Sequence, residues 1–219
     1  MAKETKIKEK KDYDINELVC IEGSEGQRYY SKRDDRGNQI YFKGPKNYRI
    51  WTEYDKENNM THQKFSNGSS TLYEYDKDNR CSYSHNSNGN EEWTRYDKKG
   101  NITYYKNTHS GQEEWYKYDE NDNIVYEKFN NTGYKHQKDM KFKPYENWYK
   151  YDKNNNKIHF RDSGGWEEWW DYNEDGDLIH HRDINGEEDW YKYYKDGEEC
   201  RISKEEFESL QPKKTLSQN

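Results

Sequence analysis

Aromatic and polar residues alternate along most of the chain, in a pattern that recurs about every 21 residues. The clearest copy runs from Gly111 to Gly133, with Trp115 as its anchor, Tyr118 three residues later, a polar turn and a second apolar segment. Such alternation predicts β-strands and not helices, and a fixed period of this length is typical of repeat architectures. Apart from one wider gap, the anchors follow each other at intervals of 21 or 22 residues: Tyr30, Trp51, Leu72, Trp93, Trp115, Trp148, Trp169 and Trp190.

Each repeat contains a turn signal between its two apolar segments. In Asp97-Lys98-Lys99-Gly100-Asn101 the aspartate can accept hydrogen bonds from the following backbone N–H groups, and Gly100 can adopt a positive φ. Other repeats replace this glycine by residues that tolerate the left-handed region, namely Asn58, Asn79, Asp122 and Asn155. We therefore predict an all-β fold, in which about eight antiparallel hairpins form one elongated, twisted or curved sheet.

Segments outside the period predict the ends of this sheet and one interruption. Ser203-Lys204-Glu205-Glu206 reads as a helix N-cap box, and Phe207 and Leu210 would form the apolar side of a short capping helix. In the leader, Ile15 and Leu18 are expected to pack on the first hairpin. The predicted division is a basic leader or N-terminal cap at 1–19, repeats at 20–202 with an insertion at 134–145, the capping helix at 203–211, and a disordered tail at 212–219.

The repeat resembles the YD repeats of the RHS family, which place Tyr-x-Tyr-Asp before a Gly-Asn turn. Matching strings are Tyr116-Lys117-Tyr118-Asp119 and Tyr149-Lys150-Tyr151-Asp152, and Gly100-Asn101 is the clearest turn. Looser likenesses are to MORN-type antitoxin repeats and to the choline-binding repeats of cell-wall proteins. The RHS resemblance implies the strand pattern only, because the proline- and glycine-marked processing segment of toxin-releasing members has no match in this chain.

Composition narrows the function classes. Hydrophobic residues make up 28% of the chain and charged residues 37%, values typical of disorder. The aromatic fraction of 17%, with 23 Tyr and 8 Trp, favours a thin folded sheet instead, because amphipathic rings stabilise a sheet without a thick aliphatic core. The net charge is −7, with both signs interleaved. A nucleic-acid-binding protein is expected to carry a basic stripe, so we predict that this protein has no nucleic-acid partner.

Candidate catalytic and metal-binding residues do not form recognisable motifs. Cys20, Cys81 and Cys200 lack metal or redox spacing and are expected to be reduced thiols. His62, His159 and His180 occupy a column that holds tyrosine in other repeats, so we interpret them as structural rings. We predict no enzyme activity and no cofactor. The chain has no apolar run of membrane-spanning length and no secretory signal, which predicts a cytoplasmic protein without a membrane partner.

Two features are candidates for partner binding. The tyrosine side of the sheet is expected to be the packed face, which leaves a row of tryptophans flanked by charges for a partner. The insertion is basic, and Met140 and Phe142 could anchor it on an acidic protein surface. Repeat stacking would also make the central Trp115 more important for stability than the near-terminal Trp51. The predicted partner-binding residues are Trp93, Trp115, Lys138, Met140, Lys141, Phe142, Trp148, Trp169 and Trp190.

Three functions are compatible with these features. The first is a non-catalytic protein-binding module, such as a bacterial cytoplasmic immunity, antitoxin-like or inhibitor protein that occludes the surface of a toxin or effector. The second is an aromatic-cage module for carbohydrate or choline, which would need export. The third is an enzyme, which the absence of catalytic motifs disfavours.

Overall fold

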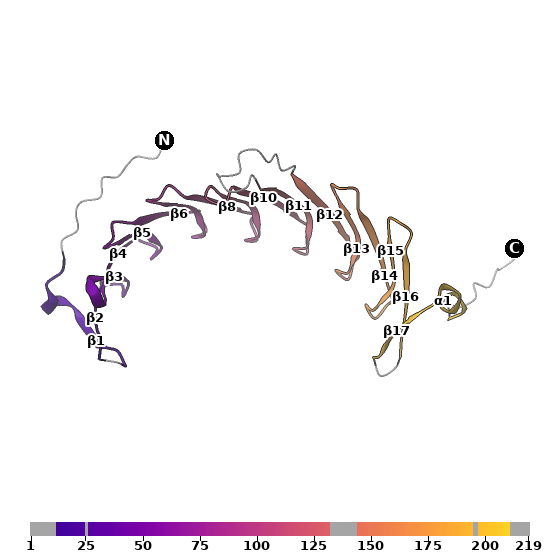
Figure 1. Ribbon diagram of the computed structural model, residues 1–219, viewed down its shortest axis with the longest axis horizontal. Coiled ribbons are helices and arrows are strands. Elements are labelled where there is room, and N and C mark those ends of the chain that lie inside the picture. The colour runs from indigo at the N-terminus through magenta and orange to yellow at the C-terminus, as the bar shows by residue number, and fades with distance from the viewer. Residues whose placement is uncertain (1–11, 25, 132–143, 195–196, 211–219) are drawn as a thin grey trace. The chain divides into compact units, whose positions relative to one another are not determined.

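The structure is a computed structural model and describes residues 12–24, 26–131, 144–194 and 197–210. Within these residues, 17 antiparallel strands form one open sheet, and one short α-helix follows the last strand (Figure 1). The predicted all-β class, the hairpin repeats and the C-terminal helix are therefore confirmed. The strands are β1 Val19–Glu22, β2 Arg28–Arg33, β3 Gln39–Lys43, β4 Arg49–Tyr54, β5 Met60–Phe65, β6 Ser70–Tyr75, β7 Cys81–Asn86, β8 Glu91–Tyr96, β9 Ile102–Asn107, β10 Gln112–Tyr118, β11 Ile124–Asn131, β12 Tyr145–Tyr151, β13 Lys157–Asp162, β14 Glu167–Tyr172, β15 Leu178–Asp183, β16 Glu188–Tyr193 and β17 Glu199–Ile202; the helices are η1 Ile15–Glu17, η2 Pro45–Asn47 and α1 Lys204–Leu210.

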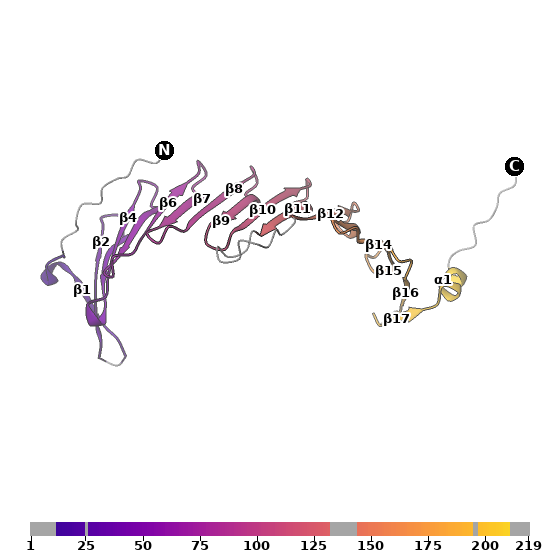
Figure 2. The same ribbon diagram turned by 45° about the horizontal axis from the view of Figure 1, so that its top comes forward.

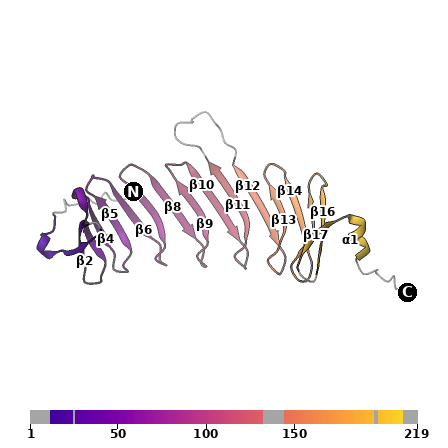
Figure 3. The same ribbon diagram turned by 60° about the horizontal axis from the view of Figure 1, so that its bottom comes forward.

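The chain divides into two compact units. The first extends to Arg95 and includes Tyr105–His109, and the second comprises Tyr96–Tyr104 and the described chain from Ser110 onward. Within each unit, strands that follow each other in sequence lie side by side, as β4 to β6 do in the first unit and β12 to β16 in the second (Figures 2 and 3). Each repeat therefore contacts mainly the repeats before and after it.

A β-bulge explains why tyrosine recurs three residues after the anchor. The strand register shifts directly before Tyr75, Tyr118 and Tyr172. Each of these phenols donates a hydrogen bond to a backbone carbonyl of the preceding hairpin, with distances of 2.8 Å for Tyr75, 2.9 Å for Tyr118 and 3.1 Å for Tyr172. The tyrosine thus ties neighbouring hairpins together where the bulge interrupts the regular ladder.

The sheet continues directly across the insertion. Strands β11 and β12 pair with each other, and Phe129 lies opposite Tyr145. The predicted insertion ended at residue 145, but Tyr145 already belongs to β12, because its backbone pairs with β11. Most of the predicted insertion, 134–143, lies outside the described residues.

The sheet has no thick core, and its few buried side chains lie on both faces. Tyr41 and Trp51 are the buried hydrophobic residues of the described chain, with 1% and 9% of their surface exposed, and His62 lies on the same face. Ser31, Thr52, Asn147 and Asp183 are buried on the tyrosine side. The prediction that the tyrosine side is the packed face is therefore not met: Tyr13, from the leader, covers part of the tryptophan side.

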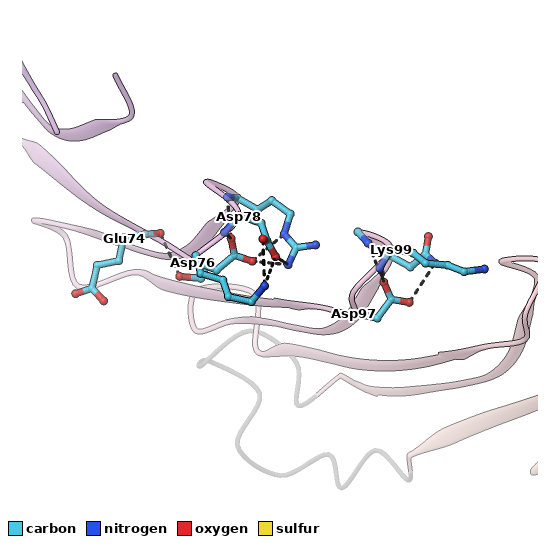
Figure 4. A network of polar contacts seen from close by, with 10 residues as sticks. Glu74, Asp76, Asp78, Asp97 and Lys99 are labelled. Carbon is cyan, nitrogen blue, oxygen red and sulfur yellow. Dashed lines mark hydrogen bonds and ion pairs between the residues drawn. The ribbon is translucent and has the colours of Figure 1, made fainter. Parts of the chain in front are cut away.

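Aspartate side chains organise the turns within the repeats (Figure 4). One carboxylate oxygen of Asp97 accepts hydrogen bonds from the backbone N–H groups of Lys99, Gly100 and Asn101, at 2.8, 2.8 and 2.9 Å. Asp76 accepts in the same way from Asp78 and Arg80, and its other oxygen receives the Arg80 guanidinium at 2.7 Å. These bonds satisfy the backbone donors of a short loop, as the sequence predicts.

The same turns are also joined from one repeat to the next. The amide nitrogen of Asn38 donates to the side chain of Asn58 at 2.9 Å, and that of Asn101 donates to Asp122 at 2.7 Å. Asn58 and Asp122 have positive φ angles of 68° and 67°. They replace glycine for two reasons: they tolerate this conformation, and they supply the acceptor that glycine lacks. Two further pairs are Asn59 with Asn79 and Asn123 with Asn155.

Acid should destabilise the fold through these aspartates. The side-chain amide of Asn123 and hydrogen bonds from backbone N–H groups hold the pKa of Asp119 below its usual range. Desolvation alone would raise the pKa of Asp55, but hydrogen bonds from Asn59 and Glu57 outweigh this effect, so the pKa of Asp55 is also lowered. A folded pKa below the unfolded value of about 3.9 stabilises the fold above that pH, and this contribution disappears as the pH falls through the folded value.

We therefore expect the urea midpoint, followed by tryptophan fluorescence, to fall between pH 5 and pH 3. The Asp119→Asn variant keeps an oxygen acceptor but cannot titrate, so its midpoint should fall less over the same range. Identical pH profiles for the variant and the parent protein would contradict a role for this carboxylate.

Candidate partner-binding face

The anchor residues of the repeats share one side of the sheet, which we call the tryptophan face. Paired residues of antiparallel strands point to the same side, so the strand register identifies the neighbours of each anchor. A typical tryptophan of this face lies between a tyrosine or histidine of the preceding strand and a lysine or arginine of the following one. Three such triplets are Tyr41, Trp51 and Lys64; Tyr126, Trp148 and Arg161; and His159, Trp169 and Arg182.

Ring contacts hold the preceding strand against the tryptophan anchors. The ring centroids lie 5.3 Å apart for Tyr83 and Trp93 and 5.8 Å apart for Tyr126 and Trp148, both in tilted geometry. His180 stacks on Trp190 at 3.7 Å. Histidine therefore takes the place of tyrosine as a ring, as we predicted for this column.

Cations lie over the anchors from the other side. The Arg182 guanidinium is 4.5 Å from the Trp169 ring centroid, and the Lys128 ammonium is 5.8 Å from that of Trp115. Such placements are favourable because the ring face is electron-rich. The alkyl stems of these residues also cover part of the indoles, so the tryptophans contribute to the sheet as well as to its surface.

Carboxylates pair with the rings and with some of the cations. The phenol of Tyr83 donates to Glu91 at 2.9 Å, and that of Tyr104 donates to Glu113 at 2.7 Å. Desolvation, together with the hydrogen bond to Glu91, raises the pKa of Tyr83 to about 12. The phenol is therefore neutral at physiological pH and acts as a donor. Glu146 forms an ion pair with Lys128 at 2.9 Å.

The second unit carries a shallow hollow on this face. Its volume is about 570 Å³, and Trp115, Tyr126 and Pro144 supply apolar surface to it. The same hollow is lined by Lys117 and Lys128, whose ammonium groups lie 5.2 Å from the Tyr126 ring and 5.8 Å from the Trp115 ring. The hollow can thus accept an apolar group beside a negative charge.

The predicted site residues fall into three groups. Trp93 lies in the first unit, and Trp115, Trp148, Trp169 and Trp190 lie in the second. Of these, Trp148 is exposed at 36%, whereas Trp190 is covered by Phe207 at a ring distance of 4.6 Å. Lys138, Met140, Lys141 and Phe142 lie outside the described residues.

Sequence reasoning missed the lysines Lys117 and Lys150, which stand two residues after Trp115 and Trp148 and are exposed on the same face. Their position in the period was visible. Their importance depends on which ring lies opposite, and only the strand register defines that.

The described residues contain no group of three or more His, Cys, Asp or Glu side chains that could hold a metal ion. Cys20, Cys81 and Cys200 form no disulfide with one another. No helix within the described ranges is long and apolar enough to cross a membrane.

Comparison with known proteins gives only distant likenesses. No protein-family model matches the chain, and no curated protein matches it either. Among solved structures, it is similar to a crystal structure of TcdB2-TccC3-TEV, with a TM-score of 0.41 and 13% identity over 79% of this chain. It is also similar to the Photorhabdus luminescens Tc holotoxin pore, with a TM-score of 0.38 and 14% identity over 79% of this chain. The chain spans 13% of the length of each of these chains.

Proposed function

We propose that this chain is a non-catalytic protein-binding module of the immunity, antitoxin-like or inhibitor type, which occludes the surface of a toxin or effector. The observation that carries this proposal is the tryptophan face of the second unit, where Trp148 is 36% exposed. Lys117 and Arg182 are exposed on the same face. Tryptophan and arginine are enriched among the residues that dominate protein interfaces.

A binding role by occlusion needs no catalytic residue and no cofactor, and we propose that the protein has neither. We place it in the cytoplasm, where Cys20, Cys81 and Cys200 would remain reduced. Its tyrosine and histidine rings are held by their neighbours in the sheet, so the face is preorganised and little conformational entropy is lost on binding.

The hollow beside Trp115 supports a second candidate, an aromatic site for carbohydrate. A choline-type ligand fits less well, because the ammonium groups of Lys117 and Lys128 already lie over the Tyr126 and Trp115 rings. A quaternary ammonium would therefore meet two like charges where an aromatic cage should offer bare ring faces.

Affinity capture from a bacterial lysate tests the first candidate. We expect one dominant protein in stoichiometric amount, and we expect the double variant Trp148→Ala/Trp169→Ala to bind it at least tenfold more weakly, which is about 1.4 kcal/mol. Trp166→Ala is the matched control, since Trp166 is 37% exposed but lies in the connection between β13 and β14, outside the strands. Circular dichroism should show that all variants are folded.

Other results would favour the alternatives. Retention on a polysaccharide matrix, reduced by Trp148→Ala/Trp169→Ala and not by Trp166→Ala, would support the carbohydrate site. Equal capture by the double variant and the parent protein would rule out the tryptophan face as the binding surface.

A further inference from the structure

In the first unit, part of the tryptophan face is already occupied by the chain's own leader. The Tyr13 ring lies 5.1 Å from the Tyr41 ring, and the Lys32 ammonium lies 4.4 Å from the Tyr13 centroid. Glu17, four residues after Tyr13, forms an ion pair with Lys32 at 2.5 Å. Asp12, the residue before Tyr13, pairs with Arg49 at 3.1 Å. The leader thus packs one aromatic ring against the rings of the tryptophan face, and its carboxylates pair with the lysine and arginine side chains of that face.

In the second unit, helix α1 occupies the face in a similar way. Phe207 packs on Trp190, with 4.6 Å between the ring centroids, and the adjacent Glu206 pairs with Lys192 at 3.5 Å. Lys192 and Lys32 hold the same place in the period, two residues after the anchor. Two unrelated segments, a coil with one 3₁₀ turn and an α-helix, therefore use the same chemistry: an aromatic ring with a carboxylate nearby.

The second unit contains an open equivalent of the site that Tyr13 occupies. In the first unit, Lys32 lies opposite Tyr41, and Tyr41 lies opposite Trp51. In the second unit, Lys117 lies opposite Tyr126, and Tyr126 lies opposite Trp148. Trp51 is 9% exposed whereas Trp148 is 36% exposed. A further copy of the arrangement consists of Lys150, His159 and Trp169.

Among the described residues, the lysines of the open copies have no acidic partner of the kind that their covered equivalents have. Lys32 and Lys192 are half-buried and ion-paired. Lys117 and Lys150 are exposed, and within the described residues neither forms an ion pair. The hollow beside Lys117 has room for a ring next to Tyr126.

We propose that these open copies bind a segment of a protein partner in which an aromatic side chain and a carboxylate stand within four residues of each other. The ring packs against Tyr126 and Trp148, or against His159 and Trp169, and the carboxylate pairs with Lys117 or Lys150. The inference rests on the proposed protein-binding function and specifies the chemistry of the partner. The ring contributes burial of apolar surface, and the ion pair selects for negative charge.

A peptide that copies residues 12–17, Asp-Tyr-Asp-Ile-Asn-Glu, with both ends blocked, is the probe. Titrated into the full chain, it should shift the indole N–H signals of Trp115 and Trp148 in ¹⁵N NMR spectra, assigned through single Trp→Phe variants. Replacing the peptide tyrosine by alanine, or its glutamate by glutamine, should weaken binding at least fivefold.

Variants of the protein test the lysines. Lys117→Glu/Lys150→Glu should weaken peptide binding at least tenfold. Lys98→Glu is the matched control for one charge reversal, since Lys98 is exposed in a turn of the second unit, and it should leave the affinity within twofold of the parent protein.

Three results would overturn the inference. The first is no shift at millimolar peptide. The second is a shift of Trp51 alone, which would mean that the peptide only displaces the leader of the same or a second copy. The third is equal affinity for the parent protein and Lys117→Glu/Lys150→Glu. If the peptide fails but a captured partner still depends on Trp148 and Trp169, the inference falls and the proposed function stands. If the peptide binds and no partner is captured, the face recognises this chemistry, but the proposed function loses its support.

Discussion

Replacing Trp51 by alanine should lower the free energy of unfolding by about 3 to 5 kcal/mol, the range for large-to-small changes of buried aromatic residues. Trp51 is 9% exposed, and its ring lies 5.8 Å from that of Tyr41, the most buried side chain of the described chain. The alanine variant would leave a cavity beneath the contact between Tyr13 and Tyr41. Urea unfolding followed by circular dichroism measures the loss.

Trp148→Ala is the matched control, because Trp148 has the same neighbours in the register, a tyrosine before it and a cation after it. Because 36% of the surface of Trp148 is exposed, we expect this variant to lose only about 1 to 2 kcal/mol of its free energy of unfolding. If the free energy of unfolding falls more in Trp148→Ala than in Trp51→Ala, the packing of the leader on this part of the sheet does not determine how much a tryptophan anchor stabilises the fold.

Replacing Gly176 by asparagine should stabilise the protein, whereas replacing it by alanine should destabilise it, with a difference of about 1 to 2 kcal/mol between the two variants. Gly176 has a φ of 89°, and no neighbouring atom lies within 4 Å of the place that a Cβ atom would take. Alanine would be strained there, while asparagine tolerates a positive φ. Asparagine would also offer an acceptor to Asn156, which holds the place that Asn38 and Asn123 hold in their turns.

A double-mutant cycle isolates that hydrogen bond. Asn156→Ala should remove most of the gain in the Gly176→Asn background, because the new acceptor would then lack its donor. Thermal unfolding of the four proteins measures the coupling. If Gly176→Asn is no more stable than Gly176→Ala, the joined turns do not contribute to stability.

Local sequence signals were enough to predict the strands, the turns and the terminal helix. Alternation around Trp115, the aspartates such as Asp97 and the N-cap at Ser203 are local signals, and local structure follows them. The histidine column could be interpreted for the same reason, since His159 and His180 replace tyrosine at one fixed position of the repeat.

Contacts between distant parts of the chain were not predictable in this way. The leader was expected to pack through Ile15 and Leu18. Ile15 is 51% exposed and Leu18 is half-buried, whereas Asp12 pairs with Arg49 and Tyr13 packs on Tyr41. The sequence around Tyr13 carries no periodic signal, because it docks across the sheet and does not extend it. Trp51, near the end of the repeats, packs on Tyr41, the ring that Tyr13 also contacts, and it is one of the two buried hydrophobic residues of the described chain.

The joined turns have a consequence for how such a protein can change in length. The bonds from Asn38 to Asn58 and from Asn59 to Asn79 each span 20 residues, and the bond from Asn101 to Asp122 spans 21. Each therefore depends on one neighbouring copy and on nothing further along the chain. Duplication of a whole copy would recreate its own bonds on both sides and add one more lysine, ring and tryptophan to the face. Each duplicated repeat would then add one binding position for a partner segment, and the other repeats would not need to change.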